Sequence, residues 1–284
     1  NVFGGSYISA DGFASDLNIA TINVFTQAAR AQTTVTVTYT NGMTSFERDV
    51  NIATTNSAGA SVDSYANGTL SLIDTEMSVG RDLNLALDGG PDPIDLGVGL
   101  MVLNPSFVDI TGNLNLGRRA AVQFGIEGLN RPVPGVLGDY SAIDAANATL
   151  AGRLALAFDF PAVALGNAFD LLRLDPGGTF SGNFEKLDVA GLPPGLAIST
   201  DVVGEAVVAT VITAGPGDYT GDREIDSADF LEWQRGETAT PYSAADLAEW
   251  EANFGTAIGS VNAVPEPETC IIICAAIPLL RRVL

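Results

Sequence analysis

The residues best suited to chemistry in this chain are six oxygen-bearing side chains spaced through one short loop. They occupy positions 1, 3, 5, 7, 9 and 12 of residues 218–229, and are Asp218, Thr220, Asp222, Glu224, Asp226 and Asp229. Oxygen ligands converge on Ca²⁺ at this spacing, with the position-7 residue contributing its backbone carbonyl. Aspartates crowded in this way repel one another unless a cation lies between them. The loop therefore predicts one Ca²⁺ site, and the alternative is an acidic loop without a metal.

A helix is expected to follow the loop from Ser227, because the next residues present an apolar face. A second segment, ADLAEW at 245–250, repeats the ADFLEW of 228–233 and places Trp233 and Trp250 at matching positions. We expect both rings to pack between two helices, the alternative being an exposed face for a partner. The segment before Asp246 has no run of aspartates, so the sequence predicts no second cation site there.

Residues 217–236 resemble a type I dockerin repeat, in which Asp fills position 12 of the loop. The resemblance implies Ca²⁺ as the cofactor and a cohesin-like partner. Two residues differ from the family pattern: Thr220 replaces Asn or Asp at position 3, and Arg223 replaces the glycine of position 6, where the loop turns sharply. We therefore expect Ca²⁺ binding that is weaker than the family norm. A stiff, calcium-dependent spacer is an equal alternative to a cohesin-binding module.

The elements that position this module are predicted to be β-strands, because a repeat runs through the first half of the chain. Four similar segments, DLNI, DVNI, DLNL and NLNL, begin at Asp16, Asp49, Asp82 and Asn113, with spacings of 33, 33 and 31 residues. Alternating runs lie between them at 34–39 and 69–73, with Asn-Gly pairs at 41–42 and 67–68 as expected turns. A fixed period in this range indicates a solenoid, and the simplest is a parallel β-helix.

The centre of each repeated segment is an asparagine flanked by two apolar residues. The apolar pair is expected to stack inside the coils, so the asparagines fall on the opposite face of each strand. They are Asn18, Asn51, Asn84 and Asn115. We expect them to form a ladder of amides between coils, the alternative being a ligand-binding face.

Residues 138–212 continue as β structure with a different pattern. Strands are expected at 148–158, 168–174 and 202–212, with turns at 176–178 and 193–195. The order of segments GDYSAIDAANATLAGRLALAF, NAFDLLR, GTFSGNFEKL and LPPGLAIST resembles the C-terminal end of autotransporter-like passenger repeats. The resemblance implies that the β-helix continues and is then capped, because an open terminal coil recruits other chains through its strand edges.

The last residues of the chain combine three parts in a fixed order. A Val-Pro-Glu-Pro element at Val264, Pro265, Glu266 and Pro267 precedes an uncharged run over 270–280, and Arg281 and Arg282 follow. The order resembles the PEP-CTERM sorting signal of exported bacterial proteins, which an exosortase processes. The run would span only about 16 Å as a helix against a hydrocarbon core of about 30 Å. We therefore expect a transient inner-membrane anchor, with the arginines on the cytoplasmic side.

Composition narrows the function further. The chain has 284 residues, 34 acidic against 13 basic side chains and a net charge of −21, which argues against binding nucleic acid or anionic lipid. It has no histidine and both cysteines lie in the tail, so Ser-His-Asp triads, imidazole zinc sites and Cys nucleophiles in the body are excluded. It begins at Asn1 without a basic and apolar leader, so we expect a removed leader or a fragment.

These observations predict a mainly β protein in three parts: a solenoid over 1–213, a small helical dockerin-like module with an EF-hand-type loop over 214–256, and a linker with the sorting tail over 257–284. The expected function is an exported, cell-surface or extracellular structural or adhesive protein rather than an enzyme. One alternative is a dockerin-bound component of a larger assembly.

The other alternative is a polysaccharide-active β-helix enzyme, which needs an acidic cluster with an Arg or Lys in a groove. Its candidate residues are Asp88, Asp92 and Asp95 and the pair Arg118 and Arg119. We expect the first three to lie on a solvated loop and the arginines at an exposed strand end.

Overall fold

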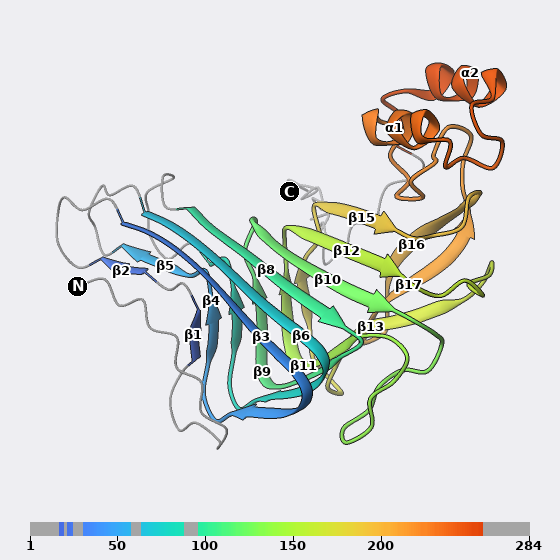
Figure 1. Ribbon diagram of the computed structural model, residues 1–284. Helices are drawn as coiled ribbons and strands as arrows, with labels where there is room; N and C mark the ends of the chain where they lie inside the picture. Colours follow the sequence, from blue (N-terminus) through green and yellow to red (C-terminus); the bar gives the residue numbers. More distant parts are fainter. Residues whose placement is uncertain (1–16, 20–21, 25–30, 58–63, 88–95, 258–284) are drawn as a thin grey trace, which may run out of the picture.

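The computed structural model describes residues 17–19, 22–24, 31–57, 64–87 and 96–257. Strands make up 53% of it and helices 9%, which confirms the prediction of a mainly β chain. The strands wind into a β-solenoid of about four turns, and two small helices follow at its C-terminal end (Figure 1).

The repeated segments lie above one another on one face of the solenoid, which we call the ladder face. Leu17 pairs in parallel with Val50, Val50 with Leu83, and Leu83 with Leu114, so the predicted spacing is the length of successive coils. The ladder face consists of β1 (Leu17–Ile19), β4 (Val50–Ile52), β7 (Leu83–Leu85), the second halves of β9 (Phe107–Leu116) and β11 (Ala142–Leu150), and β14 (Phe180–Gly182).

Two further faces complete each coil. The long strands β3 (Ala31–Phe46) and β6 (Ser64–Val79) bend at Asn41 and Asp74, which adopt positive φ angles of 53° and 49°. The halves of these strands before the bend form the first of the two faces, and the halves after the bend form the second. The first half of β6 pairs with β8 and its second half with β9. The turn predicted at Asn41 is therefore a corner, whereas Asn67 and Gly68 lie inside β6 and the turn predicted there is wrong. The first face continues through β8 (Leu96–Asn104), β10 (Ala120–Ile126), β12 (Arg153–Phe158) and β15 (Lys186–Ala190), and the second ends at β13 (Ala168–Leu174).

The core is a set of apolar columns that run from coil to coil. On the ladder face Val50, Ile52, Leu83 and Leu85 are fully buried, and each lies in register with its counterpart on the next coil. Each buried aliphatic side chain of this size contributes about 1.5–3 kcal/mol relative to an exposed one. A short separate pair, β2 (Ile22–Val24) and β5 (Thr55–Ser57), extends the same parallel stacking at the N-terminal coils.

The C-terminal end differs from the prediction in two strands. The expected strand over 148–158 is split into β11 and β12, because Gly152 adopts a φ of 70° between them. The expected strand over 202–212 is a hairpin of β16 (Leu196–Val203) and β17 (Ala206–Thr213). β17 pairs with β13 in the antiparallel sense, so this hairpin ends the parallel ladder and forms the expected cap. The predicted strand over 168–174 is confirmed as β13.

Candidate metal loop

The predicted Ca²⁺ loop lies between the solenoid cap and α1 (Ser227–Arg235), and α2 (Ala244–Asn253) packs beside it. Helix α1 begins at the predicted residue. Asp226 caps it by accepting a hydrogen bond from the Ala228 amide, and Asp229 completes a capping box by accepting from the Asp226 amide. The sharp turn expected at position 6 occurs at Arg223, which adopts a φ of 71° in the region that glycine favours.

The carboxylates of Asp218 and Asp229 are buried at the centre of the loop and organise its backbone. Asp218 accepts hydrogen bonds from the amides of Gly221 and Arg223 at 2.8 and 3.2 Å. Asp229 accepts from the amides of Tyr219 and Thr220 and from the Thr220 hydroxyl through the same oxygen. Backbone amides therefore fix the orientation of the Asp218 and Asp229 carboxylates, and the Thr220 hydroxyl contacts Asp229.

Burial in this loop penalises the charged forms of two of its carboxylates. Burial, followed by the charges of Asp229 and Asp222, raises the pKa of Asp218 to about 7. Burial is also the main reason that the pKa of Asp222 rises to about 6. Both shifts mean that the anionic forms are penalised in the folded loop, as is typical of buried carboxylates.

The donors fit Ca²⁺ in chemical type, since all are hard oxygen ligands on a loop of the required length. In the described part of the chain, however, no three His, Cys, Asp or Glu side chains are grouped as a metal centre. Asp226 is occupied as a helix cap, and the side chain of Glu224 is exposed while its backbone forms a bridge with Ala257. A cation therefore has to compete with backbone amides for the carboxylate oxygens, so the six-ligand Ca²⁺ site stays a prediction.

The two tryptophans hold the helical module together, as predicted. The ring of Phe230 stacks on Trp233 and tilts against Trp250, with centroids 5.6 and 4.9 Å away. The Trp233 indole donates to the Ser243 carbonyl and the Trp250 indole to the Asp226 carbonyl. Both tryptophans are half-buried, and Asp229 is the only fully buried residue that the two helices contribute. So thin a core is typical of small modules that a metal or disulfide stabilises.

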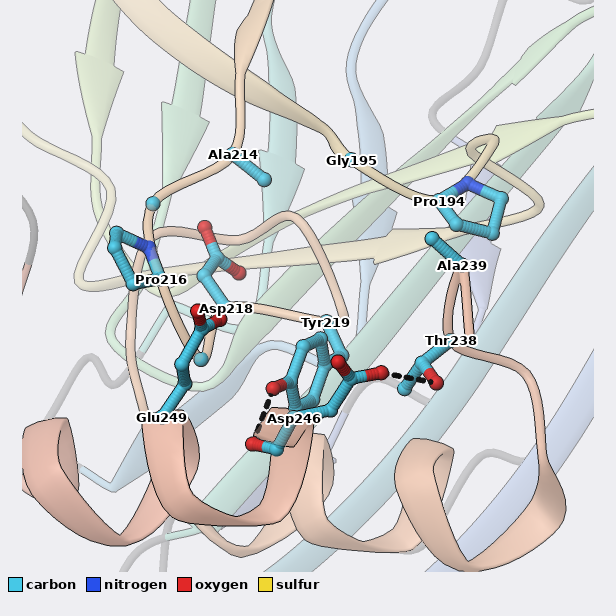
Figure 2. A pocket seen from close by; sticks show the side chains of 12 residues that line it. Pro194, Gly195, Ala214, Pro216, Asp218, Tyr219, Thr238, Ala239, Asp246 and Glu249 are labelled. Atoms are coloured by element: carbon cyan, nitrogen blue, oxygen red, sulfur yellow. Dashed lines mark hydrogen bonds between the residues drawn. The ribbon is translucent and has the colours of Figure 1, made fainter. Parts of the chain in front are cut away.

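A pocket of about 270 Å³ is lined by residues of both the module and the solenoid cap (Figure 2). Its walls include Asp218 and Tyr219 from the loop and Asp246 and Glu249 from α2, whereas Gly195 belongs to the turn before the cap hairpin. The Tyr219 hydroxyl donates to the Asp246 carbonyl, and the Asp246 carboxylate accepts from Thr238. The pocket is therefore lined by acidic side chains from both the predicted Ca²⁺ loop and α2.

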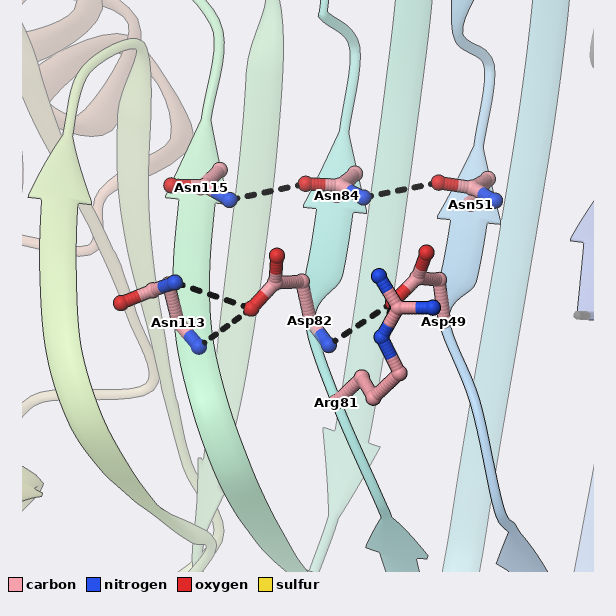
Figure 3. A network of polar contacts seen from close by, with 7 residues as sticks. All are labelled: Asp49, Asn51, Arg81, Asp82, Asn84, Asn113 and Asn115. Carbon is pink, nitrogen blue, oxygen red and sulfur yellow. Dashed lines mark hydrogen bonds and ion pairs between the residues drawn. The ribbon is translucent and has the colours of Figure 1, made fainter.

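The asparagines of the ladder face form the predicted chain of amides (Figure 3). Asn84 donates to the Oδ1 of Asn51, and Asn115 donates to the Oδ1 of Asn84, both at 2.8 Å. Asn18 pairs in register with Asn51 along the backbone. The sequence predicted this hydrogen bonding between coils, with a ligand-binding face as the alternative.

A second ladder, which the sequence reasoning missed, runs beside the first. The Asp82 amide donates to Asp49, and Asp82 accepts from both the amide and the side chain of Asn113 (Figure 3). Asn113 in turn accepts from Asn147 on the next coil. The signal was present in the sequence, because these residues open the same repeated segments with the same period.

A charged group on the second face was not predicted from the sequence. Asp109 and Asp144 are neighbours in register on adjacent coils, and Arg131 reaches over from the 127–141 connection to bind Asp144 at 2.5 Å. Burial, followed by the charges of Asp144, Asp175 and Glu76, raises the pKa of Asp109. The two carboxyl groups therefore differ in charge environment, although they lie on adjacent coils.

Of the residues considered for an enzyme, the structure describes only Arg118 and Arg119. Asp88, Asp92 and Asp95 lie outside the described residues, as do the sorting residues Val264, Pro265, Glu266, Pro267, Arg281 and Arg282. Arg118 and Arg119 lie on an exposed turn before β10, where Arg118 approaches Glu185 at 3.4 Å. Neither of the described helices has the length and apolarity needed to cross a membrane.

Comparison with protein-family models and with curated proteins finds no match for this chain.

Proposed function

We propose that the protein is an exported structural or adhesive solenoid of the bacterial cell surface or extracellular matrix, stiffened at its C-terminal end by one Ca²⁺. The observation that carries the proposal is the pair of ladders, in which polar side chains of the ladder face bind to the next coil rather than converging on a ligand. Such stacking produces a stiff rod whose stability is the sum of its coils and their interfaces.

The Ca²⁺ part of the proposal is supported by the thin core of the module and by the raised pKa of Asp218. Asp218, Asp222 and Asp229 would hold the cation with Thr220 and the backbone of Glu224. The cation would supply the positive charge that the buried carboxylates lack, and would thereby fix the loop to α1. The side chain of Asp226 would act chiefly as the helix cap.

Calorimetric titration of Ca²⁺ into a chain that ends at residue 263 tests this part. We expect one site, with a higher melting temperature in Ca²⁺, and loss of both in Asp218→Ala/Asp222→Ala. The matched control is Glu205→Ala/Glu251→Ala, which removes the same charge from two exposed positions and should leave the site intact. Absence of binding heat in the unsubstituted chain would contradict the Ca²⁺ site. Residues 214–256 would then be interpreted as a helical linker.

Export and sorting are supported by the three-part tail. An exosortase-type enzyme would recognise residues 264–267 and release the protein from its transient anchor. Expression in an exosortase-containing bacterium tests this, with the mature C-terminus read by mass spectrometry. We expect Pro265→Ala/Glu266→Ala/Pro267→Ala to leave the full-length chain in the inner membrane, while Thr269→Ala is processed normally. Identical processing of both variants would contradict the sorting role.

A second candidate function, action on a polysaccharide, is favoured by one observation. Asp109 and Asp144 lie on adjacent coils in different charge environments, the arrangement from which acid and base pairs are built. Incubation with acidic polysaccharides tests it, and loss of any depolymerisation in Asp109→Asn would assign the reaction to this pair. A cohesin-like partner is tested by binding of the same chain to a purified cohesin.

A further inference from the structure

The connection between β10 and β11, residues 127–141, folds back on itself as an arm that contacts the second face of the solenoid. Within the arm the Asp139 amide donates to the Asn130 carbonyl at 2.7 Å, and the Asn130 side chain donates to the Asp139 carboxylate at 2.5 Å. At the tip, Val133 and Val136 exchange backbone hydrogen bonds at 3.0 and 2.8 Å around a two-residue turn. The arm is therefore shaped by hydrogen bonds of its own.

The tip of the arm is bound to β6. The Gly135 amide donates to both carboxylate oxygens of Glu76, at 3.1 and 3.0 Å, and Glu76 is only 8% exposed. Gly135 follows Pro134 in the turn and has a φ of 81°, which glycine adopts without strain. A buried carboxylate is costly unless its oxygens accept hydrogen bonds, so this contact fixes the tip against the second half of β6.

The base of the arm is bound to β11 and β13. The Arg131 guanidinium forms an ion pair with Asp144 of β11 at 2.5 Å and donates to the Asp170 carbonyl of β13 at 3.2 Å. The Arg131 side chain is only 12% exposed, whereas that of Arg118, in its ion pair on the turn before β10, is 86% exposed. Loss of one partner from a shielded pair leaves the other charge uncompensated, so Arg131 binds the arm more firmly than an exposed pair would.

The two attachments join coils that are not neighbours. On the second face the strand order is β6, β9, β11 and β13. Adjacent strands lie about 4.8 Å apart, so β6 and β13 are separated by about 14 Å. Each ladder bond described above joins one coil to the next, whereas the arm connects β6 directly to β11 and β13. The arm therefore adds a coupling that is absent from a solenoid whose repeats contact only their neighbours.

We propose that the arm is a staple that makes β6, β9, β11 and β13 open as one unit, with Arg131 and Glu76 as its anchoring residues. To separate β6 from β13, the chain has to break the hydrogen bonds between coils and one attachment of the arm together. Among the described residues, the coils that precede β6 have no such tie, so they open one at a time from the N-terminal end. The staple requires neither the Ca²⁺ site nor the sorting tail of the function proposed above.

Native-state amide hydrogen exchange of the full chain in rising, sub-denaturing urea tests the staple. We expect peptides from the second half of β6, from β9 and from β13 to open at one common urea concentration, and β3 to open at a lower one. Arg131→Gln keeps a polar side chain but removes the ion pair. In this variant we expect β13 to open separately from β6 and to exchange at least about tenfold faster. Glu76→Gln weakens the other attachment, so β6 should separate from β11 and β13.

Two controls distinguish the staple from a general loss of stability. Arg118→Gln removes the same charge from an exposed contact with Glu185, so the common opening should persist. Leu172→Val removes part of a buried side chain of β13 and leaves the arm intact. We expect it to destabilise the four strands together, because the staple still couples them.

Separation of β6 from β13 in the two arm variants, with a common opening in both controls, is the result that supports the staple. Separate opening of β6 and β13 in the unsubstituted chain would overturn it. A common opening that persists in both Arg131→Gln and Glu76→Gln would also overturn it, because the hydrogen bonds between coils would then couple the strands alone. If neither arm variant folds, Leu172→Val still decides, since separate opening there would show that core packing, not the arm, couples the strands.

Discussion

A single asparagine can join three coils because its amide has both a donor and an acceptor. Asn84 uses both, donating to Asn51 and accepting from Asn115. The neighbouring ladder has a different requirement, since Asp49 and Asp82 accept from backbone amides and need no donor of their own. The choice between Asn and Asp at two positions only two residues apart therefore follows from which group faces them on the next coil.

Replacement of Asn84 by alanine breaks the amide chain at its centre. We expect Asn84→Ala to lower the free energy of unfolding by about 1–3 kcal/mol, because Asn51 and Asn115 both lose a partner. The control is Asn67→Ala at an exposed position on β6, expected to cost less than about 0.5 kcal/mol. Denaturant unfolding followed by circular dichroism measures both, and equal costs would contradict the role of the ladder.

The acidic loop predicts a pH dependence in the absence of Ca²⁺. The folded pKa values of Asp218 and Asp222, about 7 and about 6, lie above the ordinary aspartate value. Their contribution to stability is therefore complete below about pH 4 and is lost as the pH rises through about 6 to 7. Thermal melts in chelator should show a lower transition at about pH 8 than at about pH 5. Asp218→Asn/Asp222→Asn should flatten this difference, and so should Ca²⁺ for the unsubstituted chain.

At the scale of the element, corners decide where strands end. Gly152 joins β11 to β12 with a φ of 70°, and a Cβ there would lie 2.2 Å from the Ala120 carbonyl oxygen. Gly204 turns the cap hairpin with a φ of 60° but has no atom within 4 Å of a Cβ. Both glycines therefore require a left-handed backbone conformation, but only Gly152 has neighbouring atoms where a Cβ would lie.

Alanine at these two glycines separates backbone strain from steric contact. We expect Gly204→Ala to cost about 1–2 kcal/mol, which is the strain of the left-handed conformation alone. Gly152→Ala should cost about 3 kcal/mol or more, because the backbone of the previous coil has to move. Thermal unfolding of the two variants measures the difference, and equal shifts would show that the corner adapts without cost.

The elements that sequence reasoning identified were those with a local periodic signal. The apolar-Asn-apolar segments predicted the parallel stacking of β1, β4, β7 and β9 and the register between them. The hairpin of β16 and β17 was not predicted, because the residues around Gly204 and Glu205 form one apolar run and the two-residue turn interrupts it only briefly. The contact between Arg223 and Ser199 was out of reach, since it joins residues whose proximity depends on the cap.

At the scale of the whole molecule, the cap hairpin covers the strand edge of β13, which could otherwise pair with strands of other chains. β17 covers β13 in the antiparallel sense, and Gly221 of the predicted Ca²⁺ loop in turn contacts β16. A chain that ends at Ala190 leaves the edge of β13 open, and we expect it to form oligomers through that edge. A chain that ends at Thr213 keeps the hairpin and should associate less. Sedimentation velocity compares them, and monomers in both cases would show that the hairpin is not needed for solubility.

The direction of the hydrogen bonds between coils has a mechanical consequence. Each ladder bond joins one coil to the next, so the bonds lie along the direction in which the coils stack (Figure 1). A pull between the two ends of the rod acts on every coil, and we expect an end coil to detach first because it has a neighbour on one side only. The molecule would then lengthen by whole coils, and release of one 33-residue repeat frees about 110 Å of chain. A solenoid built in this way would absorb a sudden load by lengthening in steps of one coil.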